Sequence, residues 1–184
     1  MQGSIMYSDS GQGLNAEFPA PPKVHWVALF LAGIAVGILV AIFVPRPYQA
    51  LANSLVDNAW PVYFCIWLRE LNPDSNSFFW CDAYVVVELG YASMALVRNP
   101  SQLTHAVAGL LGLASTVLGI ATIFIIRKEL LRHYNEREPY GLHLEGVITF
   151  FFSFLYFQSQ LYPIAKAKNE AAMRRETASA RPIV

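Results

Sequence analysis

Five segments of the sequence are apolar over about the length that a helix needs to cross a lipid bilayer, which is roughly 20 residues. We expect helices over residues 25–44, 48–69, 78–97, 102–127 and 144–165. Only 14% of the residues are charged, whereas a typical soluble domain carries about 25%. The sequence therefore predicts an all-α fold, a polytopic membrane helix bundle of four to five transmembrane helices built from residues 23–165.

The segments that flank this bundle are polar. Residues 1–22 are rich in Gly, Ser and Pro and lack the basic-then-apolar order of a signal peptide, so we expect a disordered N-terminal tail. Residues 166–184 form a basic C-terminal tail. We expect the lipid bilayer as a partner and the cell (inner) membrane as the location. The formal net charge of zero gives no reason to expect a nucleic-acid partner.

The distribution of Lys and Arg leaves the course of the fifth segment open. We call the side that holds the N-terminal tail side A and the opposite side B. Five full crossings place 6 basic residues on side A and 7 on side B, which gives no orientation under the positive-inside rule. A fifth segment that re-enters, or lies in the interface, gives 11 on side A and 2 on side B, with side A cytoplasmic. Hydropathy slightly favours the full crossing, although its uninterrupted apolar core, Val147 to Phe157, is only 11 residues long.

Two carboxylates interrupt the apolar segments at nearly the same predicted depth. Asp57 in the second segment and Glu88 in the third both fall roughly 10–13 Å from side B, at about 1.5 Å per residue. The short connection between these segments makes them antiparallel neighbours. We expect polar groups from four helices to converge near side B, where the two carboxylates would be joined by Asn53, His105, Gln158 and Gln160.

This predicted polar site has two interpretations. No Lys or Arg lies at that depth, so at least one of the two carboxyl groups should be protonated. In the first interpretation, neutral Asp57 and Glu88 hold helices together by hydrogen bonds worth about 0.6–2 kcal/mol each. In the second, the pair shares one proton and serves as the proton or cation site of a small oligomeric channel or transporter. We favour the first.

Small residues spaced four apart predict the faces through which helices pack. The first segment contains Gly33 and Gly37, and the fourth contains Gly112 and Gly119, each four residues after Ala108 or Ser115. Such spacing lets two helix backbones approach closely in lipid. We expect these glycines to pack mainly against helices of the same chain, with dimerisation as the alternative.

The connection before the fifth segment is dense in groups that can bind metals. It reads HYNEREPYGLHLEG and holds His133, Glu136, Glu138, His143 and Glu145. Their spacing matches no helical metal-binding pair such as HExxH. We therefore expect a solvated turn next to the membrane and no metal site.

No catalytic motif is found elsewhere in the sequence. A nucleophile elbow, a phosphate-binding loop and a haem-attachment motif are all absent, so we predict no catalytic residue and no cofactor. Cys65 and Cys81 should lie near side A on adjacent helices, as free thiols if side A is cytoplasmic.

Two stretches resemble a loose group of small multi-pass bacterial membrane proteins of uncharacterised function. The stretch WLRELNPDSNSFFW fits the pattern W-x-R-x-L-x-P-x-S with Trp67, Arg69, Leu71, Pro73 and Ser75. The stretch LLRHYNEREPYGLHLEGVITFFFSFLYFQSQL fits a second pattern, HYN-x-x-EP-x-G-L-x-L-x-G-V-x-T-FFF-x-x-x-Y-x-Q. The matching positions include His133 to Asn135, Glu138, Pro139, Gly141 and Phe150 to Phe152. The resemblance covers about half of the chain and implies a multi-pass membrane protein, but no activity, ligand or site residue.

From these features we expect an integral membrane protein of accessory or assembly type rather than an enzyme. It would act through its glycine-bearing helices and its basic tail on a membrane-protein partner or on a second copy of itself. The channel or transporter built on Asp57 and Glu88 is the alternative.

Overall fold

The computed structural model describes residues 18–138 and 140–179. Five α-helices run through this part of the chain, namely α1 (Trp26–Phe43), α2 (Arg46–Leu71), α3 (Ser77–Ser93), α4 (Gln102–Arg132) and α5 (Gly146–Ser179). A short helix η1 (Met94–Leu96) follows α3, and a π-helical turn η2 (His133–Arg137) follows α4. The described residues form no strand, so the expected all-α fold with five helices is confirmed. Most of the predicted N-terminal tail lies outside the described residues.

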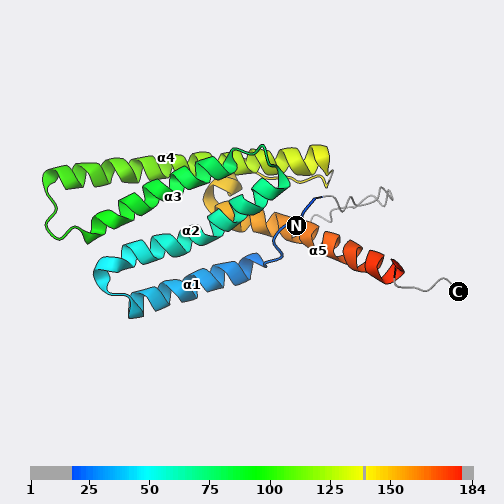
Figure 1. Cartoon of the computed structure of the whole chain (residues 1–184), viewed down its shortest axis with the longest axis horizontal. Helices are drawn as coiled ribbons and strands as arrows, with labels where there is room; N and C mark the ends of the chain where they lie inside the picture. Colours follow the sequence, from blue (N-terminus) through cyan, green and yellow to red (C-terminus); the bar gives the residue numbers. More distant parts are fainter. Residues whose placement is uncertain (1–17, 139, 180–184) are drawn as a thin grey trace.

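Helices α1 to α4 lie side by side as an extended layer (Figure 1). The α1–α2 and α3–α4 connections lie at one end of this layer, which corresponds to side B. The start of α1, the α2–α3 connection and the end of α4 lie at the other end, side A. Helix α3 packs between α2 and α4, as the short connections predict.

Local sequence explains where the first helices begin and end. His25 caps α1, because its Nδ1 accepts a hydrogen bond from the Val27 amide at 3.3 Å. Prolines on either side of Arg46 separate α1 from α2, and a proline in the first turn of a helix is well tolerated. The Gln49 side chain fastens this turn by donating to the carbonyls of Ala41 at 3.2 Å and Val44 at 3.0 Å.

Helix α5 does not run through the layer as a straight fifth helix. Its helical geometry breaks at Ser153, which has φ 41° and ψ −120°, a conformation that side-chain-bearing residues rarely adopt. The Glu145 amide, just before α5, donates to the Tyr156 hydroxyl at 3.2 Å. A tyrosine side chain cannot bridge the roughly 16 Å that eleven residues span in a straight helix, so the chain folds back at Ser153. After the break, α5 runs away from the layer on side A (Figure 1).

The fold-back corrects the expectation of a fifth full crossing. The part of α5 after Ser153 lies beside the start of α1, where the rings of His25 and Tyr162 are 5.2 Å apart. The helix then continues to Ser179, so most of the segment predicted as a basic tail is helical. Of the two courses that the sequence left open, the structure has the one that returns to side A.

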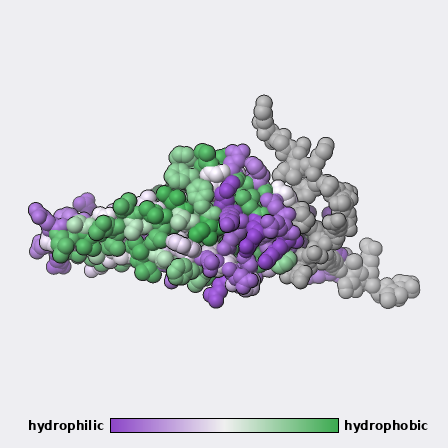
Figure 2. All heavy atoms as spheres, turned by 90° about the horizontal axis from the view of Figure 1, so that it is seen from above, coloured by the Kyte–Doolittle hydropathy of each residue, from purple (hydrophilic) through white to green (hydrophobic). Residues whose placement is uncertain are grey.

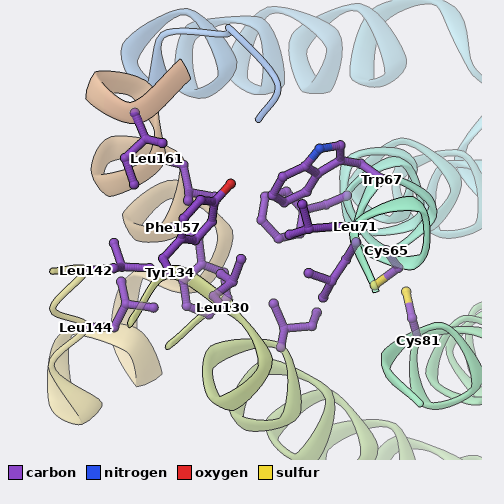
Figure 3. Close-up of a cluster of buried hydrophobic side chains, with 14 residues drawn as sticks. Cys65, Trp67, Leu71, Cys81, Leu130, Tyr134, Leu142, Leu144, Phe157 and Leu161 are labelled. Carbon is purple, nitrogen blue, oxygen red and sulfur yellow. The ribbon is translucent and has the colours of Figure 1, made fainter. Parts of the chain in front are cut away.

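The buried core is concentrated at side A (Figure 3). There α2, the end of α4, the connection after it and α5 bring together large apolar side chains: Phe64, Trp67, Leu68, Leu71, Leu130, Tyr134, Leu142, Leu144, Phe157 and Leu161. Farther toward side B, apolar side chains of α1 to α4 face outward. In Figure 2 a green apolar zone lies between a polar tip and a polar opposite end.

Two helical segments are long and apolar enough to cross a membrane by length and composition. They are Trp26–Phe43, which is α1, and Gln102–Arg137, which joins α4 and η2. Helices α2 and α3 do not meet this criterion: α3 is only 17 residues long, and polar and charged side chains lower the hydropathy of α2.

Candidate functional site

Helices α3 and α4 meet along a regular antiparallel seam that contains Glu88. The Ser115 hydroxyl of α4 donates a hydrogen bond to the Glu88 carboxylate. About two helical turns toward side A along α4, the Thr122 hydroxyl donates a hydrogen bond to the Trp80 carbonyl at 3.1 Å. The polar group in the middle of the third helix therefore has a partner within the chain, and it sits at a helix–helix interface.

Two of the three glycines of α4, Gly112 and Gly119, complete this seam. A Cβ atom added to Gly112 would lie 3.2 Å from the Tyr91 ring, and one added to Gly119 would lie 3.1 Å from the Tyr84 ring. Each glycine thus makes room for a tyrosine of α3. The prediction that these two glycines mark a packing face agrees with this arrangement, and their partners are aromatic rings rather than a second small-residue stripe.

The glycines of α1 differ from Gly112 and Gly119. A Cβ atom added at Gly33 or Gly37 would meet nothing within 4 Å. The expectation that this pair packs against another helix of the same chain is therefore wrong. Because α1 carries apolar side chains on every side, this face resembles the rest of its exposed surface.

Asp57 lies on α2 near the same seam but without a partner. It is exposed and makes no hydrogen bond or ion pair with any described residue. Both Asp57 and Glu88 lie close enough to the Tyr84 hydroxyl to act on it electrostatically. The two carboxylates therefore occupy one region, as their predicted depth requires, but no direct hydrogen bond joins them.

The neighbouring polar residues of α2 divide between two faces. Asn53 is exposed one turn before Asp57. Asn58 and Ser54 are buried instead, and the Asn58 amide donates to the Ser54 carbonyl at 2.7 Å. The buried Asn58 amide is thus satisfied within α2, whereas the exposed Asn53 and Asp57 side chains make no hydrogen bond with the described residues.

The remaining residues of the predicted polar site lie elsewhere. His105 is exposed in the first turn of α4, near the side B connection. Gln158 is fully buried at side A, where its Nε2 donates to the carbonyls of Pro22 and Val24 at 2.6 Å each. Gln160 follows two residues later on the same limb of α5. The predicted convergence of Gln158 and Gln160 with Asp57 is therefore wrong, because α5 turns back at Ser153.

A second polar cluster, which the sequence did not predict, lies at side A. Glu138 accepts a hydrogen bond from the Lys168 ammonium at 2.6 Å, and its other carboxylate oxygen lies 3.4 Å from the Nε2 of His133. The side chains of His133 and Glu138 are 3% and 4% exposed, and that of Lys168 is 9% exposed. The connection predicted as a solvated turn is thus partly a buried ion-pair site. Its sequence signal was the density of charged groups, but the cation that pairs with them comes from α5.

Burial controls the protonation of His133. This residue lies six positions past Arg127, where α4 has left its apolar stretch, so it is outside the membrane-spanning segment proposed below. Desolvation lowers the pKa of His133 below its usual 6.5, and the nearby Glu138 opposes the shift without cancelling it. His133 is therefore neutral at pH 7, and the charged pair within this cluster is Glu138 with Lys168.

The segment before α1 covers this cluster. The Phe18 ring packs edge-on against His133, with ring centroids 4.9 Å apart. The Lys168 ammonium also donates to the Phe18 carbonyl at 3.4 Å. Together with the Gln158 contacts, these bonds attach residues 18–24 to α5, so the side A end is closed by polar contacts as well as by the apolar core.

Two further polar contacts fix the side A end. Ser75, in the α2–α3 connection, donates to the Glu129 carboxylate of α4. The Arg127 guanidinium donates to the Leu144 carbonyl through Nε at 2.9 Å and Nη2 at 2.5 Å. These hydrogen bonds attach the end of α4 to the α2–α3 connection and to the connection between α4 and α5.

Cys65 and Cys81 are free and buried, on α2 and α3 as expected, and their sulfur atoms face each other (Figure 3). Within residues 18–138 and 140–179, no group of three or more His, Cys, Asp and Glu side chains is arranged to hold a metal ion.

No protein-family model, curated protein or solved structure matches this chain.

Proposed function

We propose that this chain is a multi-pass membrane protein in which α1 to α4 cross the bilayer and α5 stays on side A. The observation that carries the proposal is the exposed apolar surface of all four helices, for example at Phe30, Ile38, Leu55, Val86, Leu110 and Leu113. Soluble monomers rarely expose apolar patches larger than a few hundred Å², and a bilayer would cover this surface. Helices α2 and α3 would cross beside the more apolar α1 and α4.

The charge distribution supports side A as the cytoplasmic side. With α5 returning to side A, the side A segments carry 11 of the 13 Lys and Arg residues of the chain. Arg46 and Arg98 are the two on side B. An excess of basic residues marks the cytoplasmic loops of membrane proteins, and the inner membrane of a bacterial cell would suit such a chain.

We propose further that the protein has a non-enzymatic accessory or assembly role. The Glu88 carboxylate is engaged by Ser115, and the polar groups that a conduit would gather near side B are dispersed. The outward faces of α1 and α2 and the basic side A end remain available to other membrane proteins and to anionic lipid headgroups, at about 1 kcal/mol per basic residue near the surface.

Cysteine labelling from each side of the membrane tests the topology. In a Cys65→Ser/Cys81→Ser background, the exposed positions of Asp74→Cys and Glu170→Cys should react from one side with a membrane-impermeant maleimide. Asn99→Cys should react only from the other side. Labelling of Glu170→Cys together with Asn99→Cys would overturn the course proposed for α5.

The accessory role has its own test. We expect the chain to purify from its native membrane with a stoichiometric partner protein. We also expect the purified chain alone to carry no ion flux in liposomes. Proton or cation flux through the isolated chain would instead support the channel or transporter that Asp57 and Glu88 suggest.

A further inference from the structure

One face of α2 is covered along half of its length and open along the rest. The face is defined by helical spacing and runs through Asn53, Asp57, Trp60, Phe64, Leu68 and Leu71. On side A, Phe64, Leu68 and Leu71 are at most 1% exposed, and the Phe64 ring lies 5.8 Å from that of Phe154 and 6.1 Å from that of Phe157. Toward side B, Asn53 and Asp57 are exposed. The face is open there because α5 turns back at Ser153.

The open half carries a charge that lipid does not accommodate. Asp57 lies eleven residues after the start of α2, about 16 Å along the helix axis. In the topology proposed above, on which this inference rests, that depth is inside the hydrocarbon region. An ionisable side chain at such depth nearly always faces protein or water and has a partner, whereas Asp57 has neither a hydrogen bond nor an ion pair with the described residues.

The groups beside Asp57 favour a cation. Trp60 lies one turn further along the same face, and its ring is 5.3 Å from that of Tyr63, which is exposed. Trp and Tyr rings attract Lys and Arg through their electron-rich faces.

A second copy of this chain would not supply that cation. In α2 to α4, the described basic residues lie toward side B at Arg46 and Arg98, or toward side A at Arg69, Arg127, Lys128 and Arg132. Within the described helices α1 to α4, no basic residue lies at the depth of Asp57. A homodimer through this face would place two carboxylates together, which is costly without a counter-charge.

We propose that the open half of this α2 face docks a membrane-spanning helix of another protein that carries Lys or Arg at the depth of Asp57. The ammonium or guanidinium group would pair with Asp57 and lie against the Trp60 ring. The docked helix would continue the interface that α5 already forms on the same face, so the core would extend from side A toward side B.

Photo-cross-linking in the native membrane tests this docking site. A benzophenone amino acid replaces Asn53 on the open face, and a control places it at Ile38, which is exposed on α1 at a similar distance from side B. We expect position 53 to capture a protein, identified by mass spectrometry, whose cross-linked span contains Lys or Arg. We expect Asp57→Asn to lower the yield at least about tenfold, because the partner's cation is then left unpaired, and Asp57→Lys to abolish it. Position 38 should not capture that protein.

The decisive test uses this chain purified together with the captured partner protein. Replacing the partner's basic residue by Asp should abolish complex formation, and combining that change with Asp57→Lys should restore it. The proposal is overturned by a cross-link to a second copy of the chain, by lipid adducts alone, by a captured span without a basic residue, or by an unchanged yield with Asp57→Asn. If the cross-linking or the charge exchange fails while the cysteine labelling gives the expected result, only the docking site is rejected. If the cysteine labelling fails, the proposed topology is rejected.

Discussion

Glu88 of α3 accepts a hydrogen bond from the Ser115 hydroxyl of α4, midway along the seam where these helices meet. The carboxylate in the middle of an apolar helix thus serves as a contact between helices. The partner is a neutral hydroxyl, so the contact does not require Glu88 to be ionised.

We expect Glu88→Gln to fold and to behave as the wild type does, because an amide oxygen can still accept the Ser115 hydrogen bond. Ser115→Ala should lower the stability by about 0.6–2 kcal/mol, the range measured for hydrogen bonds between membrane helices. Thermal unfolding in detergent measures both effects. Loss of a pH-dependent ion flux in Glu88→Gln, with the fold intact, would contradict the structural role and favour the conduit.

The glycines of the seam should be far less tolerant of substitution than those of α1. Gly119→Leu and Gly112→Leu drive new atoms into the Tyr84 and Tyr91 rings, since even a Cβ atom would lie 3.1–3.2 Å away. We expect each to cost about 1–3 kcal/mol, as overpacking typically does. Gly33→Leu, the matched control, meets open space and should be neutral or slightly stabilising, because glycine is the weaker helix former. Equal losses at Gly33 and Gly119 in thermal unfolding would argue against the seam.

The helices were predictable from sequence, and the course of the fifth was not. The lengths of the apolar segments and the positions of the prolines predicted the bounds of α1 to α4 to within a few residues. The turn in α5 depends on Ser153, a residue with no turn-forming tendency strong enough to identify it in the phenylalanine-rich run around it. The number of Lys and Arg residues on each side was the sequence signal that favoured a return to side A. The apolar length of residues 144–165 favoured a full crossing instead.

The same turn explains which site residues were predictable. Asp57 and Glu88 were placed in one region, because a short connection fixes the pairing of α2 with α3. Gln158 was misplaced, because its position depended on the direction of α5. The cluster of His133, Glu138 and Lys168 joins residues 30 apart in sequence through a contact between α5 and the end of α4, and no local pattern encodes such a contact.

The Glu138–Lys168 pair should be among the most sensitive contacts of the molecule. Lys168→Met leaves a buried carboxylate without its cation, and breaking a buried ion pair in this way costs about 3–5 kcal/mol. We expect thermal unfolding to show this loss, and limited proteolysis to cut α5 more rapidly after Ala165. Lys166→Met is the control, because its pair with Glu170 is exposed at 4.0 Å and should be worth no more than about 0.5 kcal/mol. Equal effects of the two substitutions would show that the pair is not buried in solution.

His133 should make the side A end sensitive to acid. Burial lowers its pKa below the usual 6.5, so the unfolded chain binds more protons than the folded chain between the folded-state pKa and about pH 6.5. Stability therefore falls as the pH decreases through this window and is fully present above it. Lys168 and Arg137 oppose protonation of His133, whereas Glu138 favours it more weakly than burial disfavours it. We expect the melting temperature to fall between pH 7.5 and pH 5.5, and His133→Asn to reduce this fall. His143→Gln, an exposed control in the same connection, should keep the full fall, and a melting temperature that rises toward pH 5.5 in the wild type would contradict a buried neutral His133.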